Sequence, residues 1–72
     1  MNEGELYYDE SRDRLYAKDD GTAEHYFHCG DALQIWINHA WLETRAEYNE
    51  NIGWYCYGVS DLYSGMEVRY YE

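Results

Sequence analysis

The residues best suited to metal chemistry are two histidines and two cysteines, namely His25, His28, Cys29 and Cys56. Imidazole and thiolate groups are suitable ligands for a tetrahedral zinc ion. Their spacing fits poorly, because no Cys-x-x-Cys pair occurs and because adjacent strand residues such as His28 and Cys29 point to opposite faces. The other interpretation is that both cysteines are small buried apolar residues and that the histidines flank a turn. We therefore expect no metal and no cofactor, and reduced thiols.

A nucleophilic site would need a cysteine or serine beside a histidine that a third group orients. Cys29 follows His28, but no Gly-x-Ser-x-Gly motif accompanies the pair. The glycine patterns of Walker and dinucleotide-binding loops are also absent, and Gly53, Gly58 and Gly65 are isolated turn residues. Carboxylates are so numerous that pairs at catalytic distance would arise by chance. The sequence predicts that the protein is not an enzyme.

The net charge of −10 comes from five basic and fifteen acidic side chains in 72 residues. It excludes non-specific attraction to nucleic-acid phosphates or anionic membranes and favours a basic partner. Stacking on bases would need a basic groove, so direct nucleic-acid binding is expected only if Arg12, Arg14 and Lys18 cluster. The alternative is that the acidity only keeps an aromatic-rich domain soluble. Without a signal peptide or a long apolar run, a cytoplasmic protein is expected.

Acidic residues are densest between Met1 and Asp31, a segment with nine acidic and three basic side chains. Short runs rich in tyrosine and leucine alternate there with polar segments typical of turns. The second turn ends in Gly21, which tolerates a positive φ. The expected order is a strand at Leu6–Tyr8, a turn at Asp9–Asp13, a strand at Leu15–Ala17, a turn at Asp19–Gly21 and a strand at Thr22–Phe27.

The central stretch, residues 31–48, admits two interpretations. In the first it is a helix with Asp31 as N-cap and one apolar stripe, made of Leu33, Trp36, Ile37, Ala40, Trp41, Thr44 and Tyr48. In the second, Leu33, Ile35 and Ile37 form one face of a strand, Asn38–Ala40 turns, and residues 41–48 return. Strand propensity favours the second only modestly.

The remaining residues read as strands and turns. Asn49–Gly53 is expected to turn, Trp54–Tyr57 to form a strand, and Val59–Gly65 to form a loop. In the last strand Met66, Val68 and Tyr70 alternate with polar or exposed positions. Residues 1–72 are thus expected to form one domain.

Several motifs occur in an order that resembles the DUF5348 family of short bacterial proteins and mobile-element proteins. They cover about two-thirds of the chain and are His28-Cys29-Gly30-Asp31, Leu33-Gln34-Ile35, Trp41, Thr44-Arg45-Ala46-Glu47-Tyr48, Gly53-Trp54-Tyr55, Gly58 and Gly65-Met66-Glu67-Val68-Arg69. The Leu6–Glu10 opening also fits. The order is similar to SH3-like barrels, and this resemblance favours strands in the central stretch. One departure is the Asn38–Ala40 turn, which would more usually contain glycine, because Ala40 has no easy access to positive φ.

The predicted fold is therefore all-β, a small, partly open SH3-like barrel of five to six antiparallel strands at residues 28–72 after an acidic hairpin region at residues 1–27. The first functional hypothesis is a non-enzymatic inhibitor that occupies the basic nucleic-acid-binding surface of another protein. By analogy with mobile elements this would be an anti-CRISPR-like or other counter-defence protein. The predicted binding residues are Asp9, Glu10, Asp13, Asp19, Asp20, Glu24, Tyr7, Tyr8, Tyr16 and Tyr26.

The second hypothesis is a structural or adaptor domain that holds a peptide or protein through exposed aromatic side chains. In that case the acidity serves solubility alone. A monomer and a homodimer are both compatible with the sequence, since open β-edges in so small a domain can pair.

Overall fold

A computed structural model describes residues 1–21 and 23–71. Within these residues all regular structure is β, with no helix. The strands are β1 (Asn2–Asp9), β2 (Arg14–Lys18), β3 (Glu24–Tyr26), β4 (Ala32–Ile37), β5 (Ala40–Asn49), β6 (Gly53–Cys56) and β7 (Met66–Tyr70). The all-β prediction is confirmed. Thr22, at the start of the expected third strand, lies outside the described residues.

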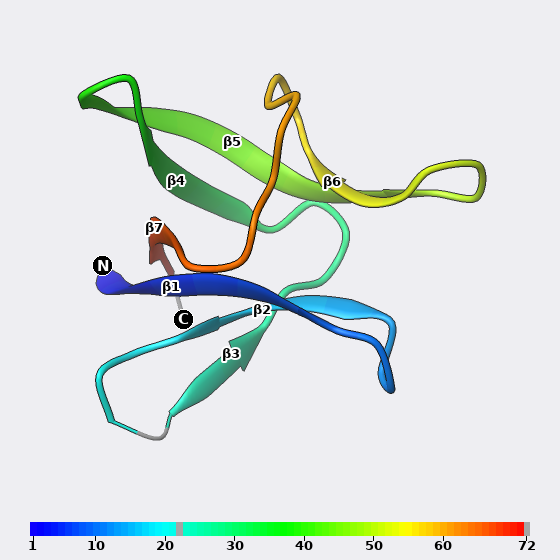
Figure 1. The fold of residues 1–72 in the computed structure, drawn as a ribbon, viewed down its shortest axis with the longest axis horizontal. Helices are drawn as coiled ribbons and strands as arrows, with labels where there is room; N and C mark the ends of the chain where they lie inside the picture. Colours follow the sequence, from blue (N-terminus) through cyan, green and yellow to red (C-terminus); the bar gives the residue numbers. More distant parts are fainter. Residues whose placement is uncertain (22, 72) are drawn as a thin grey trace.

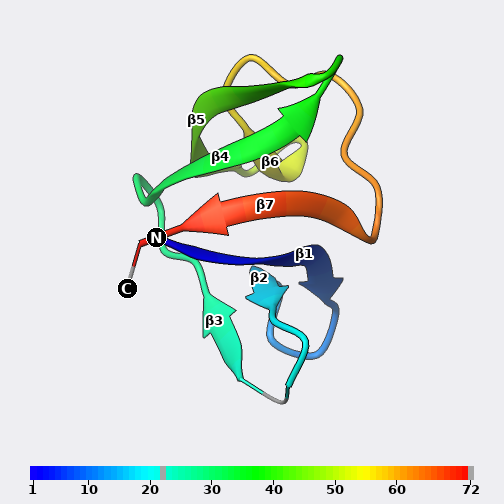
Figure 2. The same ribbon diagram turned by 90° about the vertical axis from the view of Figure 1, so that its left-hand side faces the viewer.

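The strands form one antiparallel sheet in the order β3-β2-β1-β7-β4-β5-β6. Two three-stranded meanders, β1-β2-β3 and β4-β5-β6, are thus joined by β7, which pairs with β1 on one side and β4 on the other. The sheet curls into a half-barrel with one meander on each side of β7 (Figures 1 and 2). The two ends of the chain lie close together, because Asn2 pairs with Tyr70.

The central stretch consists of strands, so the helical interpretation is wrong. Leu33 and Ile35 are fully buried, whereas Trp36 between Ile35 and Ile37 is exposed, as expected for a period of two residues. A helical stripe would leave Ile35 outside it. The cross-strand register of β4 and β5 instead places Ile35 on the interior face.

The β4–β5 turn differs in detail from the prediction. Ile37 pairs with Ala40, so the loop contains only Asn38 and His39, with φ values of 52° and 63°. Positive φ at both central residues is the requirement of a type I′ hairpin turn. The conformational strain therefore falls on His39, while Ala40 already belongs to β5.

Two aspartates organise the turns of the N-terminal meander. Asp9 Oδ1 accepts hydrogen bonds from the backbone N–H of Ser11 at 3.0 Å and of Arg12 at 3.2 Å. Asp19 Oδ1 accepts one from the backbone N–H of Gly21 at 2.9 Å. Gly21 does not have positive φ, contrary to the prediction, because this side-chain bond shapes the turn instead.

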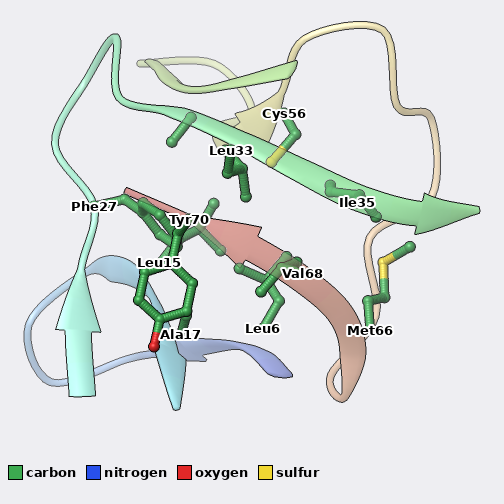
Figure 3. Packing of buried hydrophobic residues seen from close by; sticks show 11 residues of the cluster. Leu6, Leu15, Ala17, Phe27, Leu33, Ile35, Cys56, Met66, Val68 and Tyr70 are labelled. Carbon is green, nitrogen blue, oxygen red and sulfur yellow. The ribbon is translucent and has the colours of Figure 1, made fainter. Parts of the chain in front are cut away.

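The core lies on the concave face of the sheet and draws on both meanders (Figure 3). It consists of Leu6, Leu15, Ala17, Phe27, Leu33, Ile35, Ala46, Cys56, Met66, Val68 and Tyr70. Each large aliphatic or aromatic side chain that leaves water here contributes about 1.5–3 kcal/mol. Phe27, which follows β3, packs edge-on against Tyr70 with ring centroids 6.1 Å apart. The N-terminal residues are thus part of the same core as the later strands.

Gly4 allows β1 to lie very close to the backbone at the end of β2. A Cβ atom at this position would lie 2.5 Å from the backbone oxygen of Lys18. Glycine inside a strand typically marks such a close backbone approach. The close packing of β1 against the end of β2 therefore requires glycine at this position.

Candidate functional site

Three of the predicted tyrosines form a row across the outer, convex face of the N-terminal meander. Tyr7 of β1, Tyr16 of β2 and Tyr26 of β3 are register partners on neighbouring strands. Their ring centroids are 5.7 Å and 5.0 Å apart, and the second pair is stacked. We call these three residues the tyrosine row. It presents a fixed aromatic surface that loses little entropy on binding.

Carboxylates hold both ends of the tyrosine row. The Tyr7 hydroxyl donates to Glu5 at 2.7 Å, and this hydrogen bond raises the pKa of the tyrosine. The Tyr26 hydroxyl donates to Asp9 at 3.0 Å, and desolvation followed by this bond raises its pKa. Hydrogen bonds from Ser11 and then Tyr26 lower the pKa of Asp9. Asp9 therefore has a structural function in the turn as well as a negative charge.

A shallow acidic groove of about 250 Å³ lies beside the row on the same face. Its lining includes the carboxylates of Glu3, Glu5, Asp20 and Glu67 and the indole of Trp41. We call these five residues the acidic groove. Glu5 and Glu67 are direct cross-strand partners on β1 and β7. Like charges placed directly opposite each other in a sheet are destabilising.

The groove's negative charge is only partly neutralised. Arg69 lies 3.9 Å from Glu3 and 4.1 Å above the Trp41 ring. Lys18 is in register with Glu5. Within the described residues, neither Glu67 nor Asp20 forms a salt bridge. A cationic side chain entering the groove would meet the carboxylates of Glu67 and Asp20, while Arg69 already lies over the Trp41 ring.

The structure separates the predicted binding residues into several places. Asp20 joins the acidic groove, and Glu24 lies beside Tyr26, 3.4 Å from its hydroxyl. Tyr8 lies on the opposite side of β1, where its hydroxyl donates to Asp13 at 2.6 Å, which raises its pKa to about 12. Glu10 and Asp19 lie in turns. Tyr7, Tyr16 and Tyr26 therefore share one face of the sheet, whereas Tyr8 lies on the opposite side of β1.

Sequence reasoning missed Glu3, Glu5, Glu67 and Trp41 as members of one site. The alternation of β1 could have placed Glu3 and Glu5 beside Tyr7 on one face. No local signal could have added Glu67 and Trp41, because they come from β7 and β5 and reach the groove only through the strand order.

The four candidate zinc ligands do not converge. Cys56 is fully buried, whereas Cys29 is exposed in the turn between β3 and β4, so the prediction of a buried side chain is wrong for Cys29. His25 stacks on Tyr70 with centroids 5.0 Å apart, and His28 lies 3.6 Å from Asp31. Among residues 1–21 and 23–71, no three His, Cys, Asp or Glu side chains are placed to hold a metal ion together.

The basic residues of the N-terminal region do not form a single cluster. Arg12 and Arg14 line a groove with His28 and Trp54, but Lys18 lies on β2 in register with Glu5. Lys18 is therefore not part of the groove that the two arginines line. No helix in the described part of the chain has the length and apolarity to cross a membrane.

The family described as a domain of unknown function, DUF5348, matches residues 4–70. The chain belongs to the DUF5348 family. A crystal structure of a protein from Ruminococcus gnavus, determined by the Northeast Structural Genomics Consortium, is similar to it with a TM-score of 0.82. The two sequences are 27% identical, and the alignment covers 94% of this chain and 99% of the other. The fold of this chain is therefore similar to that of a protein in a crystal structure. No curated protein matches the chain.

Proposed function

We propose that this DUF5348 protein is a non-enzymatic interaction module whose outer face binds a basic surface on another protein. The acidic groove supplies charge and the tyrosine row supplies contact area. The observation that carries the proposal is the cross-strand pair Glu5 and Glu67, with Asp20 lining the same groove. Such an arrangement costs folding stability, and a cationic partner would relieve the repulsion.

The geometry of the face suits arginine and lysine side chains. Glu3 and Glu5 lie two residues apart on β1, which places them about 6.8 Å apart along one face of the strand. Trp41 also lines the groove, and the Arg69 guanidinium 4.1 Å above its ring shows that this indole accommodates a cation. Tyrosines are common anchors at protein interfaces, because they bury a large area and keep a polar tip.

The specific form of the proposal is an inhibitor that covers a surface normally used to bind nucleic acid. Rows of carboxylates compete for the same arginine and lysine clusters that recognise phosphates. The resemblance to mobile-element proteins makes a counter-defence function, such as an anti-CRISPR function, the form that we would test first. This extension rests on analogy.

The test compares two variants of equal net charge. Glu5→Gln, Asp20→Asn and Glu67→Gln together remove three of the four carboxylates of the acidic groove. The control variant removes three exposed carboxylates outside it, through Glu10→Gln, Glu50→Gln and Asp61→Asn. Binding of an oligoarginine peptide is measured by surface plasmon resonance over a range of salt concentrations. We expect the groove variant to lose at least about tenfold in affinity and the control to lose less.

Two outcomes would contradict the proposal. Equal losses in both variants would show that only net charge attracts the peptide. An association rate that does not fall with salt would show that the carboxylates do not steer binding.

The specific inhibitor form needs a second experiment, in which duplex DNA competes with the wild-type protein for a captured basic partner. This form of the proposal requires that DNA displaces the wild-type protein.

A further inference from the structure

A second surface lies on the other side of β1, in a cleft between the two meanders. It consists of two adjoining depressions of about 110 Å³ and about 290 Å³ that share Tyr8, Leu15 and Leu62. Leu6 and Tyr63 extend it at one end, and Ile52 and Trp54 at the other. We call these seven residues the apolar cleft. Tyr7 of the tyrosine row also lines the smaller depression, but no residue of the acidic groove lines either depression, so the apolar cleft is a candidate site separate from the acidic groove.

The floor of the apolar cleft is buried and its rim is exposed. Leu6 and Leu15 are only 2% and 5% exposed, whereas Tyr8, Ile52 and Tyr63 are 46%, 68% and 65% exposed. Apolar rims of this kind around a concave surface are typical of interaction sites. An engineered cavity of about 150 Å³ holds a benzene molecule, so the larger depression has room for one or two apolar side chains.

Asp13 fixes the orientation of two aromatic residues at the cleft. Its carboxylate accepts a hydrogen bond from the Tyr8 hydroxyl at 2.6 Å, and its backbone oxygen accepts one from Trp54 Nε1 at 2.7 Å. Asp13 itself has a φ of 49°, a left-handed conformation that is uncommon for a residue other than glycine. Tyr8 belongs to β1 and Trp54 to β6, so one strained residue ties the two meanders together. The aromatic walls are thereby held in place before any ligand binds.

The charge distribution decides which occupant fits. Although the chain carries fifteen carboxylates, none of the described residues that line either depression is charged. The depressions therefore suit uncharged apolar side chains. The net charge of −10 repels an acidic ligand and also a second copy of this chain. A basic flank, by contrast, would be attracted by the whole molecule.

We propose that the apolar cleft binds a short peptide segment of another protein that has adjacent aliphatic or aromatic side chains and a basic flank. The apolar side chains occupy the two depressions between Tyr63 and Trp54. The basic residues extend from the Tyr63 end, because Arg12 and Arg14 line the groove that adjoins Trp54. This binding does not require the acidic groove, so it goes beyond the function proposed above.

The experiment uses three synthetic peptides with the same Leu-Phe core and basic, uncharged or acidic flanks. Binding is followed by tryptophan fluorescence of the whole protein, since Trp54 lines the cleft. Ile52→Glu places a carboxylate at the rim, and Leu42→Glu is the matched control at an exposed aliphatic residue outside the cleft. Both side chains are exposed, so both variants are expected to fold, which circular dichroism checks.

We expect the basic-flanked peptide to bind at least about tenfold more tightly than the acidic one. Ile52→Glu should reduce its affinity by at least about tenfold, and Leu42→Glu should leave it within about twofold. The proposal is overturned if none of the three peptides binds, if the acidic flank is preferred, or if both variants behave alike. Concentration-dependent dimerisation that Ile52→Glu abolishes would also overturn it, because a second copy would then be the occupant.

Discussion

At the scale of single residues, the close approach of two backbones at Gly4 has a measurable consequence. A methyl group there would overlap the carbonyl of Lys18, and neither β1 nor β2 can move without disturbing the sheet. We expect Gly4→Ala to lower the free energy of unfolding by about 1–3 kcal/mol, measured by urea denaturation. Gly21→Ala is the control, because the nearest heavy atom is 3.4 Å away and its φ is not positive. Gly21→Ala should leave stability unchanged or raise it slightly, because alanine lowers the entropy of the unfolded chain. An equal loss of stability in both variants would show that the overlap is not responsible.

The two cysteines should differ sharply in reactivity. Burial raises the pKa of Cys56 from 9.0 to about 11, so at pH 8 its thiol is almost entirely protonated as well as inaccessible. Cys29 is exposed. We expect iodoacetamide to modify one thiol per folded molecule at pH 8 and two in denaturant, counted by mass spectrometry. Rapid modification of both thiols in the folded protein would contradict the burial of Cys56.

The same pKa predicts the direction of a pH effect on stability. A thiol whose pKa is raised on folding contributes stability below the unfolded pKa of about 9 and loses it as pH rises toward about 11. The free energy of unfolding should therefore fall between pH 9 and 11. A Cys56→Ala variant should be less stable at every pH, but its stability should fall less between pH 9 and 11. The melting temperatures of the two proteins over this range measure the difference.

At the scale of the elements, the strands could be predicted from the sequence because their side chains alternate. Leu33, Ile35, Met66 and Val68 are all buried at intervals of two residues. The turns were less predictable, since their conformation depends on which residues are paired. The turn at Asn38–Ala40 is an example. The loop is one residue shorter than expected, so the strained position is His39 and not Ala40.

The β4–β5 turn can be tested by exchanging its residues for glycine. His39→Gly should raise the free energy of unfolding by up to about 1 kcal/mol, because Asn-Gly is the preferred sequence of a type I′ turn. Ala40→Gly should lower it by about 0.5–1 kcal/mol, because Ala40 lies in a strand with ordinary φ. Chemical denaturation of the two variants distinguishes the observed turn from the predicted one, for which the effects would be reversed.

At the scale of the whole molecule, the sequence did not reveal that the last strand, β7, lies between β1 and β4. The acidic groove exists only because β7 lies beside β1. Nothing in the local sequence of β7 indicates this position. The row of Tyr7, Tyr16 and Tyr26 was closer to prediction, since short turns connect its three strands. Charge alone indicated an acidic surface, but the strand order decides which carboxylates meet.

Electrostatic repulsion in the acidic groove predicts a stabilising substitution. Glu67→Gln removes the like-charge pair with Glu5 and should raise the free energy of unfolding by roughly 0.2–1 kcal/mol at low salt. The gain should shrink as added salt screens the repulsion. Glu50→Gln changes the net charge equally in an exposed turn, and urea titrations at two salt concentrations compare the variants. A gain that is equal for both, or independent of salt, would argue against pairwise repulsion.

The position of β7 also bears on how the chain folds. Each meander can form from neighbouring segments, but the central strand of the finished sheet is the last in sequence. Its pairing with β1 on one side and with β4 on the other closes the longest loops in the molecule. Closing long loops costs chain entropy, so these pairings are expected to form slowly. The rate-limiting event should therefore be the insertion of β7 between two partly formed halves, so that substitutions in β7 slow refolding whereas those in the β5–β6 turn mainly accelerate unfolding.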